Sequence, residues 1–403
     1  MKKLFFALLL FPFLSFAQKE ADGKGMKFEH GLSWKEIKAK AKAENKYIFM
    51  DCFTTWCGPC KYMSANIFPM AEVGEFFNKN YLMVKVQFDT TKNDNEEVKS
   101  WFPDMEAINA AYKIQAYPTY LFFDPSGTAV HRAVGSSDAK TFLAKGADAM
   151  QPEKQYYTLL HKYEKGEKSP EFLRTLASVA FDAYDMPNAK KISTEYIATQ
   201  TDLLTRENLT FLDKFTQKST DKGFDLFLNN TEKVDAVLGK DKAEQKIMGI
   251  LTVENVYPVI LKRSTPENPA PIPDFDALSA SLQTKYPKYG EELVAKGKVI
   301  YYQYKKDWNG FQSAVVAFMN KYGEKASPAE LNSYAWTVFD NCKDMTCVTE
   351  ALDWSKRSFK DKEEPMYIDT YANILHKLGR TQEAIQWEEK AVALAGAGDK
   401  KTY

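Results

Sequence analysis

Two neighbouring stretches decide the fold: Tyr47-Ile48-Phe49-Met50-Asp51-Cys52-Phe53 and, after two threonines, Trp56-Cys57-Gly58-Pro59-Cys60-Lys61. The first stretch is apolar except for one acid, which is typical of a buried β-strand. In the second, Gly58 and Pro59 keep the turn tight, and a proline is well tolerated in the first turn of a helix. The two stretches together predict a strand that runs into a helix beginning at Cys57.

The spacing of the two cysteines predicts redox chemistry. A thiolate is the nucleophile in disulfide exchange, whereas a free cysteine titrates near ~8.5. Cys57 is expected at the positive end of a helix, where a thiolate is favoured. Cys60 lies one helical turn further on, so it can attack a mixed disulfide formed on Cys57 and release the product.

The surrounding sequence predicts a small α/β domain over residues 18–150. The helix at residues 33–45 has the capping signature Ser33-Trp34-Lys35-Glu36, and a turn at 124–127 joins two strands into a hairpin. The remaining expected elements are strands at 47–53, 81–88, 117–123 and 128–134 and helices at 94–112 and 138–150.

Further residues give the sequence a resemblance to the thioredoxin family over residues 47–136. Asp51 lies six residues before Cys57, where thioredoxins carry a buried aspartate. Lys85 matches the strand lysine that neighbours this aspartate in thioredoxins. Tyr117-Pro118-Thr119 matches the cis-proline loop that faces the two cysteines. The segment between Asp89 and Tyr112 is longer than in a minimal thioredoxin, which adds a helix near one rim.

The resemblance implies a role for each of these residues. Cys57 is the attacking thiol and Cys60 the resolving thiol. Asp51 is the proton acceptor for Cys60, and Lys85 tunes it; a carboxylate in an apolar strand is costly, which favours a functional reason for its presence.

The resemblance also implies where a substrate binds. Pro118 is expected in the cis form, exposing backbone for an extended substrate, with Tyr117 and Thr119 in the same loop. Trp56 is expected to pack beside the active site.

The other cysteines and the histidines receive separate interpretations. Cys52 is expected to be a buried, inert thiol on the opposite face of the strand. Cys342 and Cys347 lie at a turn between helices and are expected to form a local structural disulfide, the alternative being a second redox pair. A zinc site shared by the two cysteine pairs also remains open. His131 is expected on the surface of the hairpin.

After residue 150 the pattern is helical throughout. Residues 175–198 and 370–393 align without a gap, and Ser327-Pro328-Ala329-Glu330 is a capping box that opens another helix. Residues 350–393 resemble tetratricopeptide (TPR) repeats. The predicted architecture is an α/β thioredoxin fold followed by an all-α solenoid of helical hairpins, divided into a TPR-like region (151–325) and TPR repeats (326–403).

Composition limits the classes of function. The chain has 403 residues, 44% of them hydrophobic and 27% charged, which excludes a disordered or low-complexity protein. Lys plus Arg and Asp plus Glu both total 54, so the charge balance gives no reason to expect a nucleic-acid partner. Only four histidines are present, and we expect no metal and no cofactor beyond a redox-active disulfide between Cys57 and Cys60.

The N-terminus reads as a secretory signal peptide over residues 1–17. Lys2 and Lys3 precede an apolar run at 4–16, and Ser15 and Ala17 suit cleavage before Gln18. An uncleaved anchor is the alternative. Cleavage would release a periplasmic or secreted protein whose thiols face an oxidising compartment.

These observations predict an exported thiol:disulfide oxidoreductase that reduces or exchanges disulfides in secreted or periplasmic proteins. The reducing direction, favoured by the Gly-Pro dipeptide, requires a membrane electron donor, and the helical repeats would recruit a protein partner. One alternative is a TPR-type binding scaffold in which the thioredoxin domain is a docking element. Another is a disulfide isomerase or oxidase, which differs in redox potential.

Overall fold

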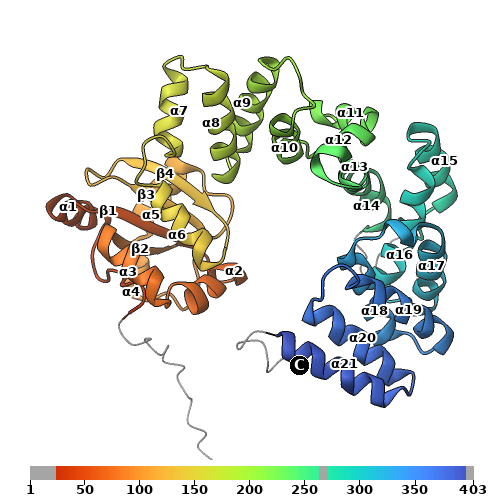
Figure 1. The fold of residues 1–403 in the computed structure, drawn as a ribbon. Coiled ribbons are helices and arrows are strands. Elements are labelled where there is room, and N and C mark those ends of the chain that lie inside the picture. Colours follow the sequence, from red (N-terminus) through yellow and green to blue (C-terminus); the bar gives the residue numbers. More distant parts are fainter. Residues whose placement is uncertain (1–23, 263–270, 396–403) are drawn as a thin grey trace, which may run out of the picture. The chain divides into compact units, whose positions relative to one another are not determined.

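The computed structural model describes residues 24–262 and 271–395, so the predicted signal peptide at 1–17 lies outside the described residues. The chain divides into two compact units, the first ending at Thr201 and the second beginning at Asp202. The first unit therefore extends past residue 150, where the sequence pattern changes from mixed to helical. Figure 1 shows the order of the elements.

A four-stranded sheet forms the centre of the first unit, in the order β2-β1-β3-β4. Its strands are β1 (Tyr47–Phe53), β2 (Tyr81–Gln87), β3 (Thr119–Phe123) and β4 (Ala129–Val134). β1 pairs parallel with β2 and antiparallel with β3, and β3 pairs antiparallel with β4. The predicted α/β class is confirmed, with β1 in the interior of the sheet.

Helices precede, connect and follow the strands of the first unit. They are α1 (Trp34–Glu44), α2 (Gly58–Tyr62), the π-helical segment η1 (Met63–Ile67), α3 (Ala71–Asn80), α4 (Glu96–Ser100), α5 (Phe102–Tyr112), α6 (Ala139–Asp148), α7 (Tyr156–Glu164), α8 (Pro170–Asp182) and α9 (Met186–Ala198). The helix predicted over 94–112 is thus two helices that meet at Trp101. Pro103 has no N–H to donate to the carbonyl of Lys99, which breaks the helical ladder there.

The two faces of the sheet bury different cores. On one face Phe49 packs against Phe77 and Phe142, whose rings stack with centroids 4.7 Å apart. On the other face Cys52 lies in a core with Trp34 of α1. Successive residues of a strand point to opposite faces, so Asp51 shares the aromatic face and Cys52 does not, as expected.

His131 corrects one expectation, because it is buried instead of lying on the surface. Its Nδ1 accepts a hydrogen bond from the backbone N–H of Tyr156 at 3.1 Å, and burial lowers its pKa to about 4. His131 is buried because α7 packs against β4. The sequence of the hairpin alone does not indicate this packing. This contact joins α7 to the sheet and accounts for part of the extension of the first unit beyond residue 150.

The second unit is helical throughout its described residues. Its helices are α10 (Arg206–Phe215), α11 (Lys222–Asn229), α12 (Thr231–Leu238), α13 (Lys242–Leu251), the π-helical segment η2 (Thr252–Val256), α14 (Tyr257–Ile260), α15 (Phe275–Lys285), α16 (Gly290–Lys305), α17 (Trp308–Tyr322), the 3-10 turn η3 (Gly323–Lys325), α18 (Pro328–Asn341), α19 (Met345–Ser358), α20 (Pro365–Lys377) and α21 (Thr381–Leu394).

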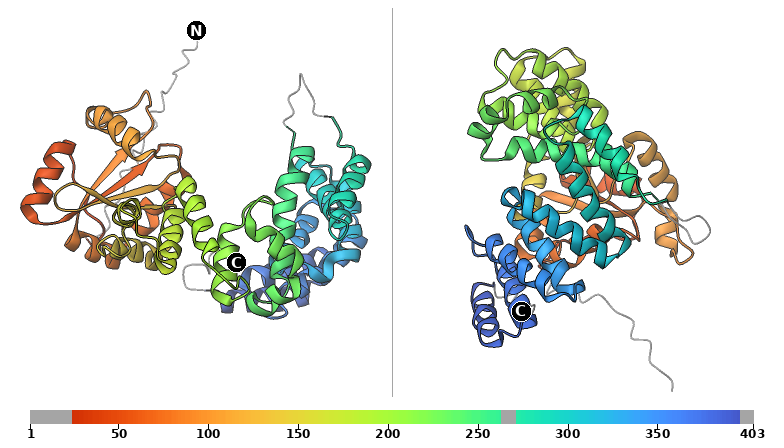
Figure 2. Two further views of the ribbon diagram at one scale, coloured as in Figure 1. Left: turned by 90° about the horizontal axis from the view of Figure 1, so that it is seen from above. Right: turned by 90° about the vertical axis from the view of Figure 1, so that its right-hand side faces the viewer.

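Consecutive helices of this unit pack as hairpins, α16 with α17, α18 with α19 and α20 with α21, drawn in blue-green to blue in Figure 2. The predicted capping box of Ser327 and Glu330 is present at the start of α18. In the repeat of residues 175–198 and 370–393, Ala177 aligns with Ala372 and Ala189 with Ala384. Ala372 and Ala384 are both buried within the α20–α21 hairpin. Of the helices in residues 24–262 and 271–395, none is both long and apolar enough to cross a membrane.

Candidate active site

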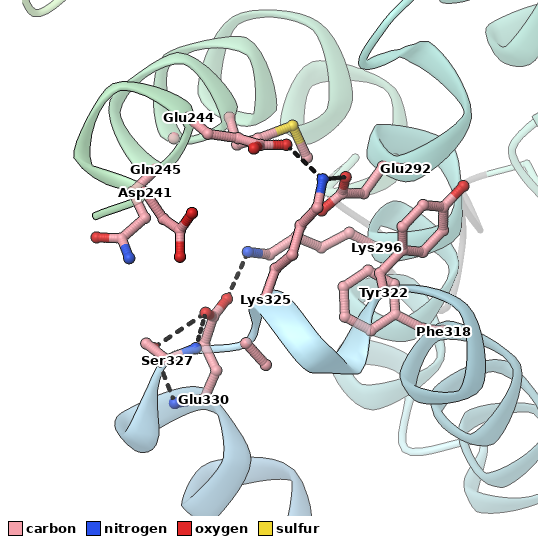
Figure 3. A pocket seen from close by; sticks show the side chains of 13 residues that line it. Asp241, Glu244, Gln245, Glu292, Lys296, Phe318, Tyr322, Lys325, Ser327 and Glu330 are labelled. Carbon is pink, nitrogen blue, oxygen red and sulfur yellow. Dashed lines mark hydrogen bonds and ion pairs between the residues drawn. The ribbon is translucent and has the colours of Figure 1, made fainter. Parts of the chain in front are cut away.

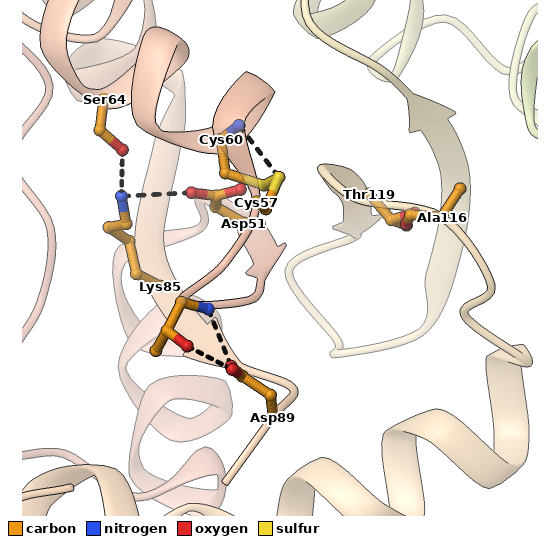
Figure 4. Close-up of a disulfide and its surroundings, with 9 residues drawn as sticks. Asp51, Cys57, Cys60, Ser64, Lys85, Asp89, Ala116 and Thr119 are labelled. Atoms are coloured by element: carbon orange, nitrogen blue, oxygen red, sulfur yellow. Dashed lines mark hydrogen bonds and ion pairs between the residues drawn. A yellow bond between two sulfur atoms is a disulfide. The ribbon is translucent and has the colours of Figure 1, made fainter. Parts of the chain in front are cut away.

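Cys57 and Cys60 form a disulfide at the start of α2, with an S–S distance of 1.99 Å (Figure 4). Cys57 is the N-cap residue of α2, and its Sγ accepts a hydrogen bond from the backbone N–H of Cys60 at 3.1 Å. The backbone N–H of Cys57 donates to the carbonyl of Thr54 at 3.2 Å, which closes the turn after β1. The strand-to-helix position predicted for Cys57 is confirmed.

The helix that begins at Gly58 continues without a break into the π-helical segment η1, which ends at Ile67. Unpaired N–H groups at the start of a helix favour negative charge nearby. A thiolate on Cys57 would keep the hydrogen bond that its sulfur already accepts from Cys60. The site therefore stabilises the nucleophilic form of Cys57 before any substrate arrives.

Asp51 is 1% exposed and lies directly opposite Lys85 in the parallel pairing of β1 and β2. Lys85 Nζ is 3.4 Å from Asp51 Oδ2, whereas Asp51 Oδ1 has no hydrogen-bond partner among the described residues. Burial raises the pKa of Asp51, and the charge of Lys85 and its hydrogen bond only partly offset that effect. Asp51 is therefore a carboxyl group that holds its proton more tightly than an ordinary aspartate.

Lys85 has other partners besides Asp51. Its Nζ donates to Ser64 Oγ at 2.6 Å, and Ser64 is part of the π-helical segment η1. The same Nζ lies 5.1–5.4 Å from the ring centroids of Phe28, Phe53 and Phe68, within the range of a cation–π attraction. No local pattern of residues indicates Ser64, Phe28 or Phe68 as neighbours of Lys85, because tertiary packing alone brings them together.

The peptide bond between Tyr117 and Pro118 is cis, as predicted. Thr119 is buried, and its Oγ1 donates to the carbonyl of Ala116 at 2.7 Å. The carbonyl of Pro118 accepts from the backbone N–H of Gly135 at 2.9 Å. These two hydrogen bonds fix the cis-proline loop on both sides.

Aromatic side chains lie beside this loop. Trp56 is 69% exposed and makes an edge-on contact with Tyr117, with ring centroids 5.9 Å apart. Phe88 lies on Tyr117 with a centroid distance of 6.1 Å, and burial raises the pKa of Tyr117. Trp56 is expected beside the active site; it lies against Tyr117 of the cis-proline loop and presents an exposed apolar surface next to Cys57.

Asp89 is a site residue whose function the sequence did not reveal. Its Oδ1 accepts the backbone N–H of Thr55 at 2.9 Å, and its Oδ2 accepts the hydroxyl of Thr55 (Figure 4). The carbonyl of Asp89 accepts Gln87 Nε2 at 2.8 Å, and Gln87 Nε2 also donates to Asp94 Oδ1 at 2.9 Å. The long rim segment that begins at Asp89 is therefore anchored to the loop that leads into Cys57.

The remaining cysteines are free thiols. Cys52 is fully buried, and burial raises the pKa of its thiol. The disulfide expected between Cys342 and Cys347 is not present: both are buried free thiols, at the end of α18 and the start of α19. Lys377 Nζ donates to the carbonyl of Cys342 at 2.9 Å, so the turn is held without a covalent bond. Nowhere in the described residues do three His, Cys, Asp or Glu side chains converge as metal ligands.

Comparisons with known proteins find thioredoxin-like relatives for the part of the chain that holds this site. The family model of a thioredoxin-like domain matches residues 34–149. Thioredoxin-like protein slr0233 of Synechocystis is 35% identical over 99 residues, which are 24% of this chain and 76% of that protein. Thioredoxin Asp f 29 of Aspergillus fumigatus is 26% identical over 103 residues, which are 26% of this chain and 78% of that protein.

A solved structure, a candidate disulphide-isomerase from Bacteroides thetaiotaomicron, is 35% identical, with a TM-score of 0.26 and coverage of 32% of this chain and 95% of that chain. The chain belongs to the thioredoxin-like family through the domain at residues 34–149. With its Cys57–Cys60 disulfide, it is a thiol:disulfide oxidoreductase.

Replacing Asp51 by asparagine should stabilise the oxidised protein at neutral and higher pH. An unfolded aspartate loses its proton near ~3.9, whereas Asp51 in the folded protein holds it to higher pH. Between those two pKa values, each pH unit costs the wild type about 1.4 kcal/mol of unfolding free energy, and Asp51→Asn avoids that loss.

Hydrogen exchange of the β1 peptide in the full-length protein measures this effect. The extra protection of Asp51→Asn should be large at about pH 8 and shrink towards about pH 4. Replacing the exposed Glu106 by glutamine is the matched control and should change nothing. An equal difference at both pH values would contradict the titration of Asp51.

Replacing Asp89 by alanine should lower kcat/KM for disulfide reduction about fivefold, because a hydrogen bond contributes about 1 kcal/mol and the loop before Cys57 loses its anchor. Asp124→Ala is the matched control, since Asp124 likewise accepts backbone N–H groups, from Ser126 and Thr128, but at the opposite end of β3. Steady-state kinetics that fall equally in both variants would show a general loss of stability instead of a local effect.

Proposed function

We propose that this protein is exported and reduces disulfide bonds in secreted or periplasmic proteins through Cys57 and Cys60. The observation that carries the proposal is the position of this pair at a helix start, in a thioredoxin-like domain that also holds the buried Asp51 and the cis-proline loop. The pair itself is the redox group, and no other cofactor is required. Electrons would come from a membrane donor, and the helices after residue 150 would recruit a protein partner.

The first step joins enzyme and substrate. The thiolate of Cys57 attacks one sulfur of a substrate disulfide, so a Cys57–substrate S–S bond forms while the substrate S–S bond breaks. The displaced substrate thiolate takes up a proton from solvent. The hydrogen bond from the N–H of Cys60 to Cys57 Sγ stabilises the attacking thiolate and, in the next step, the sulfur that is attacked.

The second step releases the product. Asp51 accepts the proton of Cys60, whose thiolate then attacks Cys57 Sγ. The Cys57–Cys60 bond forms, the mixed disulfide breaks, and the second substrate sulfur leaves as a thiolate. Two electrons have passed from the enzyme dithiol to the substrate. The raised pKa of Asp51 suits this role, because a carboxylate with a raised pKa is a better base than an ordinary aspartate.

The surface around Cys57 fits an extended protein substrate. Trp56 offers an exposed ring, and the loop of Tyr117, Pro118 and Thr119 is held rigid by hydrogen bonds to Ala116 and Gly135. A rigid extended loop can pair with the backbone of a substrate strand, while an exposed aromatic ring supplies apolar contact area. We infer that the substrate cysteine lies against Cys57, next to the surface that Trp56 and this loop form together.

A redox titration of the full-length mature protein, with alkylation and mass spectrometry of each cysteine, tests the direction. A Cys57–Cys60 potential near about −270 mV supports a reductase, whereas about −180 to −120 mV would place the protein with isomerases and oxidants. Cys57→Ser should abolish disulfide exchange, and Cys52→Ala should leave it intact. Full activity of Cys57→Ser would overturn the mechanism.

Export has a separate test. In bacterial cells that express the full chain, the mature protein should begin at Gln18 and be recovered from the periplasm or medium. Mass determination of the N-terminal peptide checks this directly. Replacing Lys2 and Lys3 by glutamate should hold the unprocessed chain in the cytoplasm, because the charged start of a signal peptide is lost. A cytoplasmic chain that still begins at Met1 in the wild type would refute export.

A further inference from the structure

The second unit contains a pocket that the disulfide chemistry does not use. It lies between α13, the start of α16, the end of α17, η3 and the start of α18, and has a volume of about 270 Å³ (Figure 3). Pockets for drug-sized ligands run from about 300 to 1,000 Å³. This one therefore has room for a single long side chain or a small organic ion, and not for a large cofactor.

The charges that line the pocket do not cancel. Four acids and two lysines line it, which leaves two negative charges. The acids are Asp241, Glu244, Glu292 and Glu330, and the lysines are Lys296 and Lys325. Lys325 Nζ lies 2.8 Å from Glu244 Oε1, and Lys296 Nζ lies 2.6 Å from Glu330 Oε1. Both lysines already have a carboxylate partner, so an incoming anion would have to displace one.

Glu292 is the most buried of the four acids. Its side chain is only 13% exposed, and the ammonium group of Lys325 is 4.0 Å away, beyond hydrogen-bond distance. Burial raises the pKa of Glu292, Lys325 and Lys296 lower it, and Glu244 and Glu330 raise it again. A cation in the pocket would supply a positive charge at hydrogen-bond distance from the Glu292 carboxylate.

One wall of the pocket is aromatic. Phe318 and Tyr322 come from the last turns of α17, with ring centroids 5.6 Å apart, and both line the pocket together with Glu292 (Figure 3). A guanidinium group is planar, stacks on aromatic rings and donates hydrogen bonds to carboxylates. A metal ion fits less well, because no three acids, cysteines or histidines converge as ligands in the described part of the chain.

We propose that this pocket binds the guanidinium group of an arginine side chain on a protein partner. Glu292 pairs with the guanidinium, Tyr322 and Phe318 contact its face, and Asp241 adds negative charge at the rim. The inference rests on the proposed role of the helices in recruiting a partner. It makes the second unit selective for basic segments of that partner.

Calorimetric titration of the full-length oxidised protein at low salt tests the pocket, with N-acetyl-arginine amide as the probe. Binding should saturate, and the neutral isostere N-acetyl-citrulline amide should bind at least about tenfold more weakly. Glu292→Gln should weaken binding of the arginine probe about tenfold. Equal binding of the two probes, or no saturable binding, would overturn the proposal without requiring any variant to fold.

Glu291→Gln is the matched control. Glu291 neighbours Glu292 on α16 but is exposed and does not line the pocket. Its partner Lys321 lies 5.4 Å from the ring centroid of Tyr322, so the variant alters a charge near the aromatic wall while it leaves Glu292 in place. Binding that depends on Glu292 should therefore be unchanged. An unchanged affinity in Glu292→Gln would also overturn the assignment. Disulfide reduction should be the same in both variants, which separates this test from that of the active site.

A peptide-display selection on the full-length protein distinguishes a partner from a free guanidinium compound. Arginine-containing peptides should be enriched on the wild type and on Glu291→Gln and lost on Glu292→Gln. Enriched peptides without arginine, bound equally by Glu292→Gln, would overturn the pocket assignment while the recruiting role stands. Saturable binding of the arginine probe with no enriched peptide would overturn the assignment to a protein partner, and the recruiting role with it.

Discussion

The structure of the active site depends on the burial of one carboxyl group. Asp51 lies in the interior strand of the sheet, with β2 on one side and β3 on the other, and solvent does not reach it. Lys85, across the parallel pairing, supplies an opposite charge, and Lys85 is itself shared with Ser64 and three phenylalanine rings. This incomplete compensation keeps a proton acceptor of raised pKa in the domain that carries the disulfide.

The same aromatic face that buries Asp51 also holds the helix of the disulfide in place. Phe49 packs against Phe77, Tyr120, Phe122 and Phe142, and Met63 of η1 lies in the same core. A close-packed core of this kind has low compressibility, so Cys57 keeps its position at the helix start. On the solvent side, Asp89 anchors the loop at Thr55, and hydrogen bonds to Ala116 and Gly135 anchor the cis-proline loop. The disulfide therefore lies between two loops that are fixed independently.

The helical unit differs from the thioredoxin-like unit in how its core and its polar groups are arranged. Its hairpins bury aliphatic and aromatic residues between neighbouring helices, which needs only a repeating pattern of small and large side chains. The polar groups at the junctions are then free to vary. At the junction of α13, α16 and α18 they form a network with more acids than lysines, whereas the turn between α18 and α19 holds two thiols and the ammonium group of Lys377.

The sequence by itself determined the elements whose signals are local. The apolar run of β1, the capping box at Ser33, the proline in the first turn of α2 and the capping box at Ser327 each involve residues within a few positions of one another. The role assignments of Asp51, Lys85 and Pro118 came from a resemblance, and the structure adds their geometry. Tertiary structure decided everything that joins distant residues: the burial of His131 under α7, the anchoring of Thr55 by Asp89, the hydrogen bond from Lys377 to Cys342, and the pocket around Glu292. Burial and pairing across long separations depend on which surfaces pack together, and no local pattern of residues records that.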